Sequence, residues 1–103
     1  MNVAQTILEQ IGGNQFRVMT GAKNFVGSDN ALRFAIPGTS TKNKANRVWI
    51  TLDATDTYTV TFQRLHAMKL NQISEVSGVY ADQLRAVFES ATGLRTSLTH
   101  VYA

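Results

Sequence analysis

The feature that most constrains this fold is the regular alternation of apolar side chains in two neighbouring segments, residues 48–53 and 58–63. Successive side chains of a β-strand point to opposite faces, so this alternation predicts two strands, each with one buried and one exposed face. Residues 54–57 have the length of a hairpin connection, which predicts an antiparallel pair. The side chains expected to point inward are Val48, Ile50, Leu52, Tyr58, Val60 and Phe62.

Two earlier segments, residues 16–19 and 31–36, alternate in the same way. They predict two more strands, the second of which is stopped by Pro37-Gly38. The side chains expected to point inward are Phe16, Val18, Leu32, Phe34 and Ile36.

Three other segments predict connections. Residues 20–30 contain two glycines and a Ser-Asp-Asn cluster, which is typical of an irregular connection or a wide turn. Residues 39–46 are polar, carry Lys42 and Lys44 and have no large apolar side chain, so we expect a mobile, basic loop. Residues 65–78 contain apolar side chains without a decisive period, and we interpret them as an extended or irregular connection.

Two helices are expected, one near each end of the chain. Apolar residues recur at helical spacing in residues 3–11, and Gly12-Gly13 can supply the left-handed backbone that ends a helix. Residues 80–91 show the same spacing, with Ser77 available as a cap and Gly93 where the helix would end. Residues 94–98 would form a short closing strand or pack as a tail.

Together these elements predict a single small α+β domain covering residues 1–103. Strands that alternate have one exposed face, so both helices must cover the other face. The expected architecture is a four-stranded, mainly antiparallel sheet with the N-terminal and C-terminal helices packed on one face, in the order α-β-β-β-β-α. Phe34, Ile50 and Phe62 are the central inward residues of their strands and should lie in the core.

The residue types argue against catalysis and against a bound metal or cofactor. The chain has no cysteine, which excludes disulfides, thiolate zinc sites, iron–sulfur clusters and a cysteine nucleophile. His66 and His100 have no histidine or carboxylate at metal-ligand spacing. Gly21-Ala22-Lys23-Asn24 lacks the full spacing of a phosphate-binding loop. We therefore expect a non-enzymatic protein without metal or cofactor.

Charge and hydropathy favour a polyanionic partner and a cytoplasmic location. Ten Lys and Arg residues against seven Asp and Glu residues give a net charge of +3. The first ten residues have no basic region, and no run approaches the roughly 20 apolar residues that span a bilayer. Ordinary solubilising charge would explain the same balance.

The exposed face of the predicted sheet supplies the candidate binding surface. Arg17, Arg33 and Trp49 would share this face, where guanidinium and aromatic planes can stack on bases or anchor a protein interface. The adjoining basic residues are Lys23, Lys42, Lys44 and Arg47. The alternative for Trp49 is structural, because residues 65–78 or the partner of a homodimer would then cover it.

Several segments also resemble a known group of proteins. Residues 19–26, which read MTGAKNFV, together with residues 12–14, 80–84 and 92–94, are similar to short proteins encoded by bacteriophages and other bacterial mobile elements. That group has no established activity, so the resemblance transfers no catalytic residue. It implies a setting inside a bacterial host cell, where small accessory proteins commonly bind nucleic acid or block a host protein.

The sequence thus favours a non-enzymatic binding module of a phage or mobile element that binds nucleic acid. Lysine and arginine side chains would neutralise phosphates without reading the base sequence. The alternative is a protein-binding inhibitor of a host factor, such as an anti-defence protein, with the Trp and Arg side chains as its anchor.

Overall fold

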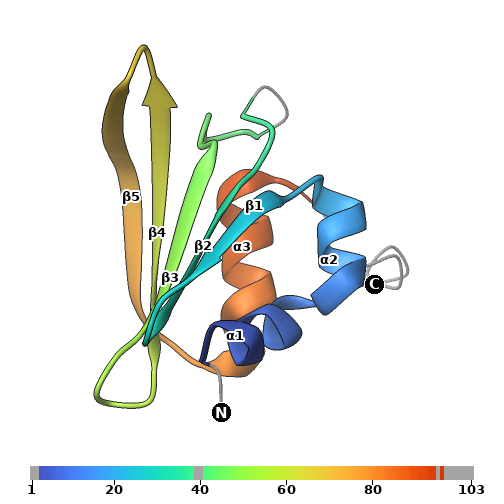
Figure 1. Cartoon of the computed structure of the whole chain (residues 1–103), viewed down its shortest axis with the longest axis vertical. Helices are drawn as coiled ribbons and strands as arrows, with labels where there is room; N and C mark the ends of the chain where they lie inside the picture. The colour runs from blue at the N-terminus through green and yellow to red at the C-terminus, as the bar shows by residue number, and fades with distance from the viewer. Residues whose placement is uncertain (1–2, 39–40, 95, 97–103) are drawn as a thin grey trace.

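The computed structural model describes residues 3–38, 41–94 and 96, and these form an α+β fold with an open antiparallel sheet of five strands (Figure 1). The elements in chain order are α1 (Val3–Ile11), α2 (Gly13–Thr20), β1 (Lys23–Gly27), β2 (Ala31–Ala35), β3 (Arg47–Leu52), β4 (Tyr58–His66), β5 (Lys69–Val79), a 3-10 turn at Ala81–Gln83, and α3 (Leu84–Thr92).

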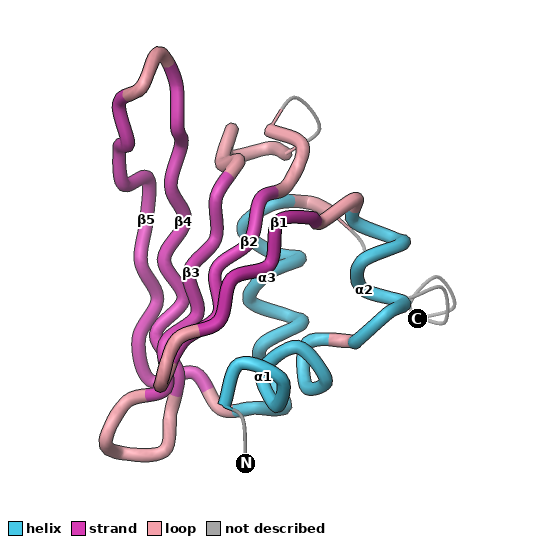
Figure 2. The backbone as a smooth tube through the Cα atoms, viewed as in Figure 1, coloured by secondary structure: helices cyan, strands magenta, loops and turns pink. Residues whose placement is uncertain are grey.

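The sheet is a simple meander, in which each strand pairs with the next one along the chain (Figure 2). The alternating segments at 31–36, 48–53 and 58–63 are the central strands β2, β3 and β4, as the sequence predicts. The predicted count of four strands is wrong, because one predicted strand is a helix and two predicted connections are strands.

Residues 16–19 belong to helix α2, so the strand predicted there is wrong. Gly12 and Gly13 have positive φ values of 134° and 60°, which let the chain end α1 and start a second helix at once. Phe16 and Thr20, four residues apart, are the buried side chains of α2, whereas Val18 is 73% exposed. An alternation of only two apolar residues does not distinguish a strand from a short helix that buries one face.

The connection predicted at residues 20–30 contains strand β1. Its pairing with β2 is irregular between Lys23 and Val26, and Asn24 has a positive φ of 58°. Phe25 of β1 stacks on Phe34 of β2 with ring centroids 5.2 Å apart. This short, bulged edge strand exposes most of its side chains, so it lacks the long alternation of the central strands.

The segment predicted as irregular at 65–78 is the end of β4 and most of β5. Strand β5 is 11 residues long and forms an edge of the sheet, where every residue before Val79 is exposed. Two irregularities in its pairing with β4 interrupt the two-residue period. An exposed, bulged edge strand needs no alternation of apolar and polar residues, which explains why the pattern is missing.

All three helices lie on one side of the sheet, and the hydrophobic core fills the space between them and the strands (Figure 1). The predicted core residues Phe34, Ile50 and Phe62 are confirmed, since none is more than 2% exposed. Phe16 packs edge-on against Phe34 and Phe88, with ring centroids 5.3 and 5.0 Å apart. These aromatic contacts join α2, β2 and α3.

The connection between β2 and β3 is anchored by polar groups. The Thr41 hydroxyl donates to the carbonyl oxygens of Gly38 and Ala45, at 3.1 and 3.0 Å. The backbone N–H of Lys42 donates to the carbonyl of Thr92 at the end of α3, at 2.8 Å. Residues 41–46 are therefore held by hydrogen bonds although they have no large apolar side chain. The mobility expected of this loop stays a prediction, and residues 39–40 lie outside the described part of the chain.

The C-terminal helix begins later than predicted. Ser77 lies in β5 and does not cap the helix. Just before α3 begins, the backbone N–H of Tyr80 donates a 3.0 Å hydrogen bond to the Gln83 side chain. Gly93 ends the helix in the left-handed conformation with φ 77°, as predicted. The closing strand or tail predicted at residues 94–98 falls largely outside the described residues.

Candidate functional site

The face of the sheet opposite the helices carries a row of side chains in direct register. Arg33 of β2 pairs with Trp49 of β3, and Trp49 pairs with Thr61 of β4. Val26 of β1 extends the row beyond Arg33, and Glu75 of β5 extends it beyond Thr61. Arg33 and Trp49 therefore share one face, as the sequence predicts.

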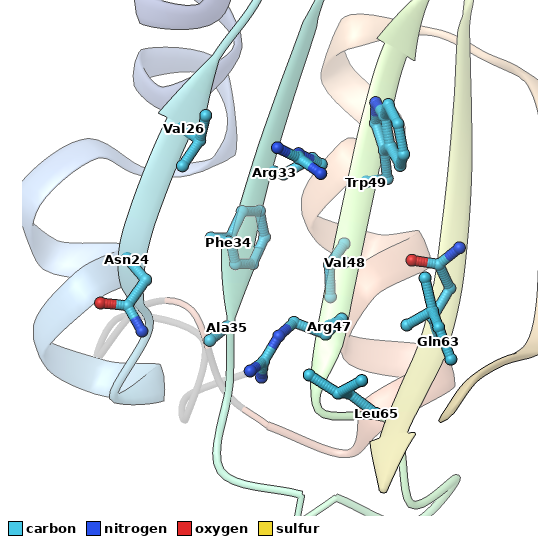
Figure 3. Close-up of a pocket in the computed structure, with 11 residues that line it drawn as sticks. Asn24, Val26, Arg33, Phe34, Ala35, Arg47, Val48, Trp49, Gln63 and Leu65 are labelled. Carbon is cyan, nitrogen blue, oxygen red and sulfur yellow. The ribbon is translucent and has the colours of Figure 1, made fainter. Parts of the chain in front are cut away.

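The row borders an open hollow of about 330 Å³ on this outer face. Figure 3 shows Arg33 and Trp49 at one end of the hollow, with Arg47 and Leu65 at the other. No acidic side chain is among the described residues that line it. We call this surface the Arg/Trp hollow; its lining residues are Asn24, Val26, Arg33, Phe34, Ala35, Arg47, Val48, Trp49, Gln63, Leu65 and Leu70.

The Arg33 guanidinium lies over the Trp49 ring, with its carbon 5.0 Å from the ring centroid. This contact is a cation–π interaction, which fixes the guanidinium while its N–H groups stay available to an acceptor. Trp49 itself is 36% exposed, so the rest of the chain does not fully cover it. The pair is therefore a preformed surface that holds a cation next to an accessible aromatic ring.

Arg47 begins β3, directly opposite Ala35, and contributes the second cation of the hollow. Its Nη1 donates to the carbonyl oxygen of Asn46 at 2.8 Å, which holds the side chain in place. An anion in the hollow would meet two guanidinium groups and no carboxylate from its lining.

The charges at the strand ends and in the turns of the sheet are separated along the strand direction. At one end of the sheet β1, β3 and β5 begin and β2 and β4 end. The strand ends and the 41–46 connection at this basic end carry Lys23, Lys42, Lys44, Arg47, Arg64 and Lys69, and no acidic residue lies in 41–47 or 63–71. The turns at the opposite end carry Asp29, Asp53 and Asp56.

The predicted site residues are only partly brought together. Arg33, Trp49 and Arg47 line one hollow, and Lys23 starts the neighbouring edge strand at its basic end. Lys44 lies in the connection that leads to Arg47, and its carbonyl oxygen accepts a 2.9 Å hydrogen bond from Arg64.

Two of the predicted site residues lie elsewhere. Lys42 packs beside Gly93 at the end of α3, behind the sheet. The placement of Arg17 on the sheet face is wrong, because Arg17 lies on α2 with its guanidinium 5.6 Å from the centre of the Phe25 ring. The cause is the strand predicted at 16–19, which is a helix.

Several residues of this surface were missed in the sequence. Gln63, Leu65 and Leu70 line the hollow, and Arg64 and Lys69 belong to the basic end. Most of them lie in residues 65–78, where no period was recognisable. The sequence offered one signal for them. Residues 63–71 carry no acidic residue, and residues 67–68 have the length of a two-residue hairpin turn.

The described residues show no sign of a metal centre or of a membrane span. No group of three His, Cys, Asp or Glu side chains that could hold a metal ion occurs among them. No helix in the described part of the chain is long and apolar enough to cross a bilayer. Burial raises the pKa of Tyr58, against the opposing effect of its hydrogen bond to Gln10, but this residue faces the core side of the sheet.

Comparisons with protein-family models, with curated proteins and with solved structures find no match to this chain. The resemblance to phage and mobile-element proteins stays a prediction.

Proposed function

We propose that this protein is a non-enzymatic module that binds nucleic acid through the Arg/Trp hollow and the basic end of the sheet. The observation that supports this most is the separation of charge. The lysines and arginines of the basic end, Arg47 among them, adjoin a hollow that is also lined by Arg33 and Trp49, while the aspartates of the turns lie at the far end. A polyanion approaching the basic end meets attraction from these cations. A carboxylate on this face, that of Glu75, lies in the middle of β5 and accepts a 3.3 Å hydrogen bond from the Thr61 hydroxyl.

Each part of the surface has a distinct task in this proposal. Arg33, held over Trp49, and Arg47 bind phosphate oxygens, since a planar guanidinium matches their geometry. Lys23, Lys44 and Lys69 add electrostatic attraction without reading sequence. The accessible edge of Trp49 is left for a base or sugar. The setting we propose is the cytoplasm of a bacterial host, in a phage or mobile element.

The proposal is tested by the salt dependence of binding to labelled single-stranded and duplex DNA, followed by fluorescence anisotropy. The logarithm of affinity should fall linearly with the logarithm of salt concentration, and each lost duplex phosphate contact should reduce that slope by about 0.9. We therefore expect Arg33→Ala and Arg47→Ala to reduce both affinity and slope. Arg17→Ala is the matched control, because it removes one exposed cation from helix α2 and should change neither.

Trp49→Ala separates stacking from phosphate binding. A base stacked on Trp49 predicts a loss of about 1–3 kcal/mol for the single strand and a smaller loss for the duplex. If Arg17→Ala weakens binding as much as Arg33→Ala, the charge acts without a defined site. If the wild-type protein binds neither DNA, the proposal is wrong.

The second candidate function, a protein-binding inhibitor of a host factor, is supported by apolar side chains around the hollow. Val26, Leu65 and Leu70 border it and are 38–52% exposed. An interface built on these residues would be weakly sensitive to salt. Capture of a protein from nuclease-treated host lysate that depends on Leu65 and Leu70, with no DNA affinity, would favour this second function.

A further inference from the structure

At the tip of the β4–β5 hairpin, Met68 has two unusual properties: a left-handed backbone and an almost fully exposed apolar side chain. Ala67 and Met68 connect the strands with φ values of 52° and 66°, so both central residues of this two-residue turn are left-handed. Such a turn strongly prefers Asn-Gly, because most side chains are strained at positive φ. Met68 is in addition 97% exposed, although its side chain is apolar. Strain and exposure therefore coincide at one residue, and such coincidences are more frequent at functional sites than elsewhere.

The hairpin tip also projects beyond the rest of the sheet (Figures 1 and 2). The first residue of β3, Arg47, pairs with Gln63, and the Asn46 side chain still bonds the backbone of Leu65 at 2.7 and 2.9 Å. Past that point β4 and β5 pair only with each other. At about 3.3 Å per residue, the turn reaches roughly 7 Å beyond Leu65, the last residue that is bonded to the neighbouring connection.

The sides of the projecting hairpin are basic, and its root is apolar. Arg64 and Lys69 flank the turn, and no acidic residue occurs between 57 and 74. Leu65 and Leu70 pair directly and line the Arg/Trp hollow, so the hairpin and the hollow form one continuous surface. The hairpin is narrow, its flanks are basic and its tip is apolar. These properties fit a partner with negative charges on its outside and an apolar interior between them. A nucleic-acid duplex has that chemistry, with charged phosphates outside and stacked bases inside.

We propose that the hairpin enters the minor groove of duplex DNA and that Met68 inserts as a wedge between two neighbouring base pairs. The inference rests on the proposed nucleic-acid function and specifies its partner. The free length of roughly 7 Å matches the groove depth of about 7.5 Å, so the tip can contact the bases while the basic residues behind it stay near the phosphates. The groove is only about 6 Å wide in straight B-DNA, and the kink at an inserted side chain would open it to admit the two paired strands. An inserted apolar side chain partly unstacks the step and kinks the duplex by about 20–90°.

The experiment uses the full chain and two short duplexes, one with a central TA step and one with a stiff A-tract. Donor and acceptor dyes at the duplex ends report bending, and 2-aminopurine at the central step reports unstacking. The wedge predicts bending, increased 2-aminopurine fluorescence and about tenfold tighter binding to the TA duplex, because pyrimidine–purine steps deform easily.

Three variants make the test specific. Ala67→Asn combined with Met68→Gly gives the turn its preferred residues, so the hairpin should stay folded while the wedge is lost. We expect it to bend neither duplex and to distinguish them by no more than about twofold. Met68→Leu keeps an apolar wedge and should retain bending. Val18→Ala is the control, since Val18 is an exposed aliphatic residue on α2, 73% exposed, and the change should have no effect.

The outcomes separate this inference from the proposed function. Wild-type binding without bending, or equal bending by the Asn-Gly variant, overturns the wedge and leaves nucleic-acid binding in place. Absence of DNA binding by the wild-type protein overturns both. Binding to vesicles of phosphatidylcholine and phosphatidylserine that depends on Met68, in place of DNA binding, would assign the tip to a membrane and also overturns the wedge.

Discussion

The two faces of the central strands should respond very differently to the loss of one aromatic side chain. Phe62 of β4 is completely buried, whereas Trp49 of the adjacent strand β3 is 36% exposed and contacts the Arg33 guanidinium. Phe62→Ala leaves a cavity in the core and should cost about 3–5 kcal/mol of the free energy of unfolding. That is a large part of the roughly 5–15 kcal/mol that stabilises a typical domain.

The cost of Trp49→Ala is the sum of two smaller losses. An exposed cation–π contact contributes about 0.5–1 kcal/mol. Cross-strand packing on the sheet face contributes about 0.2–1 kcal/mol. The total is about 1–2 kcal/mol, which corresponds to a fall in Tm of roughly 4–16 °C for a domain of this size.

Urea and thermal unfolding followed by circular dichroism measure both costs. Tryptophan fluorescence is unsuitable, because Trp49 is the single tryptophan of the chain. If Trp49→Ala destabilises the protein as much as Phe62→Ala, Trp49 has a core role and the outer face is not a free surface. If Phe62→Ala unfolds like the wild type, the assignment of the two faces is wrong.

Three further substitutions test the packing. Burial raises the pKa of Tyr58 above its usual value of 10.0, so the native state keeps a proton that the unfolded state releases. The contribution of Tyr58 to the free energy of unfolding should therefore be constant below about pH 10 and fall above it, and Tyr58→Phe should reduce that fall in urea titrations at pH 9–11. Gly27→Ala should cost about 1–3 kcal/mol in the same urea assay, because the new Cβ would lie 2.6 Å from that of Ala4 in α1; a neutral effect would mean that α1 shifts freely. Thr41→Ala removes hydrogen bonds to two carbonyl oxygens and should accelerate trypsin cleavage after Lys42 or Lys44, whereas an unchanged cleavage rate would show that the 41–46 connection needs no such anchor.

The candidate site could be predicted from the sequence only where its strands were predicted correctly. Arg33 and Trp49 came together because both lie on regular strands whose alternation fixes the face of each side chain. Arg17 was misplaced because its segment contains only two alternating apolar residues. The segment is a helix whose buried face is formed by Phe16 and by Thr20, one helical turn later. The hairpin tip was missed because exposed strands carry no hydrophobic period.

The sequence by itself determined the central strands with their inward side chains, the first helix and the end of the last helix. These features follow from local rules: alternation with the pleat, helical spacing and glycine at left-handed positions. The tertiary structure decided the two edge strands, the second helix and the joining of the Arg/Trp hollow to the basic end. An edge strand is held by backbone hydrogen bonds to its neighbour, and those bonds require no particular side chains. For that reason the sequence of β5 does not show that it is a strand. The strand, and the exposed Met68 next to it, are seen only in the folded structure, where β5 pairs with β4.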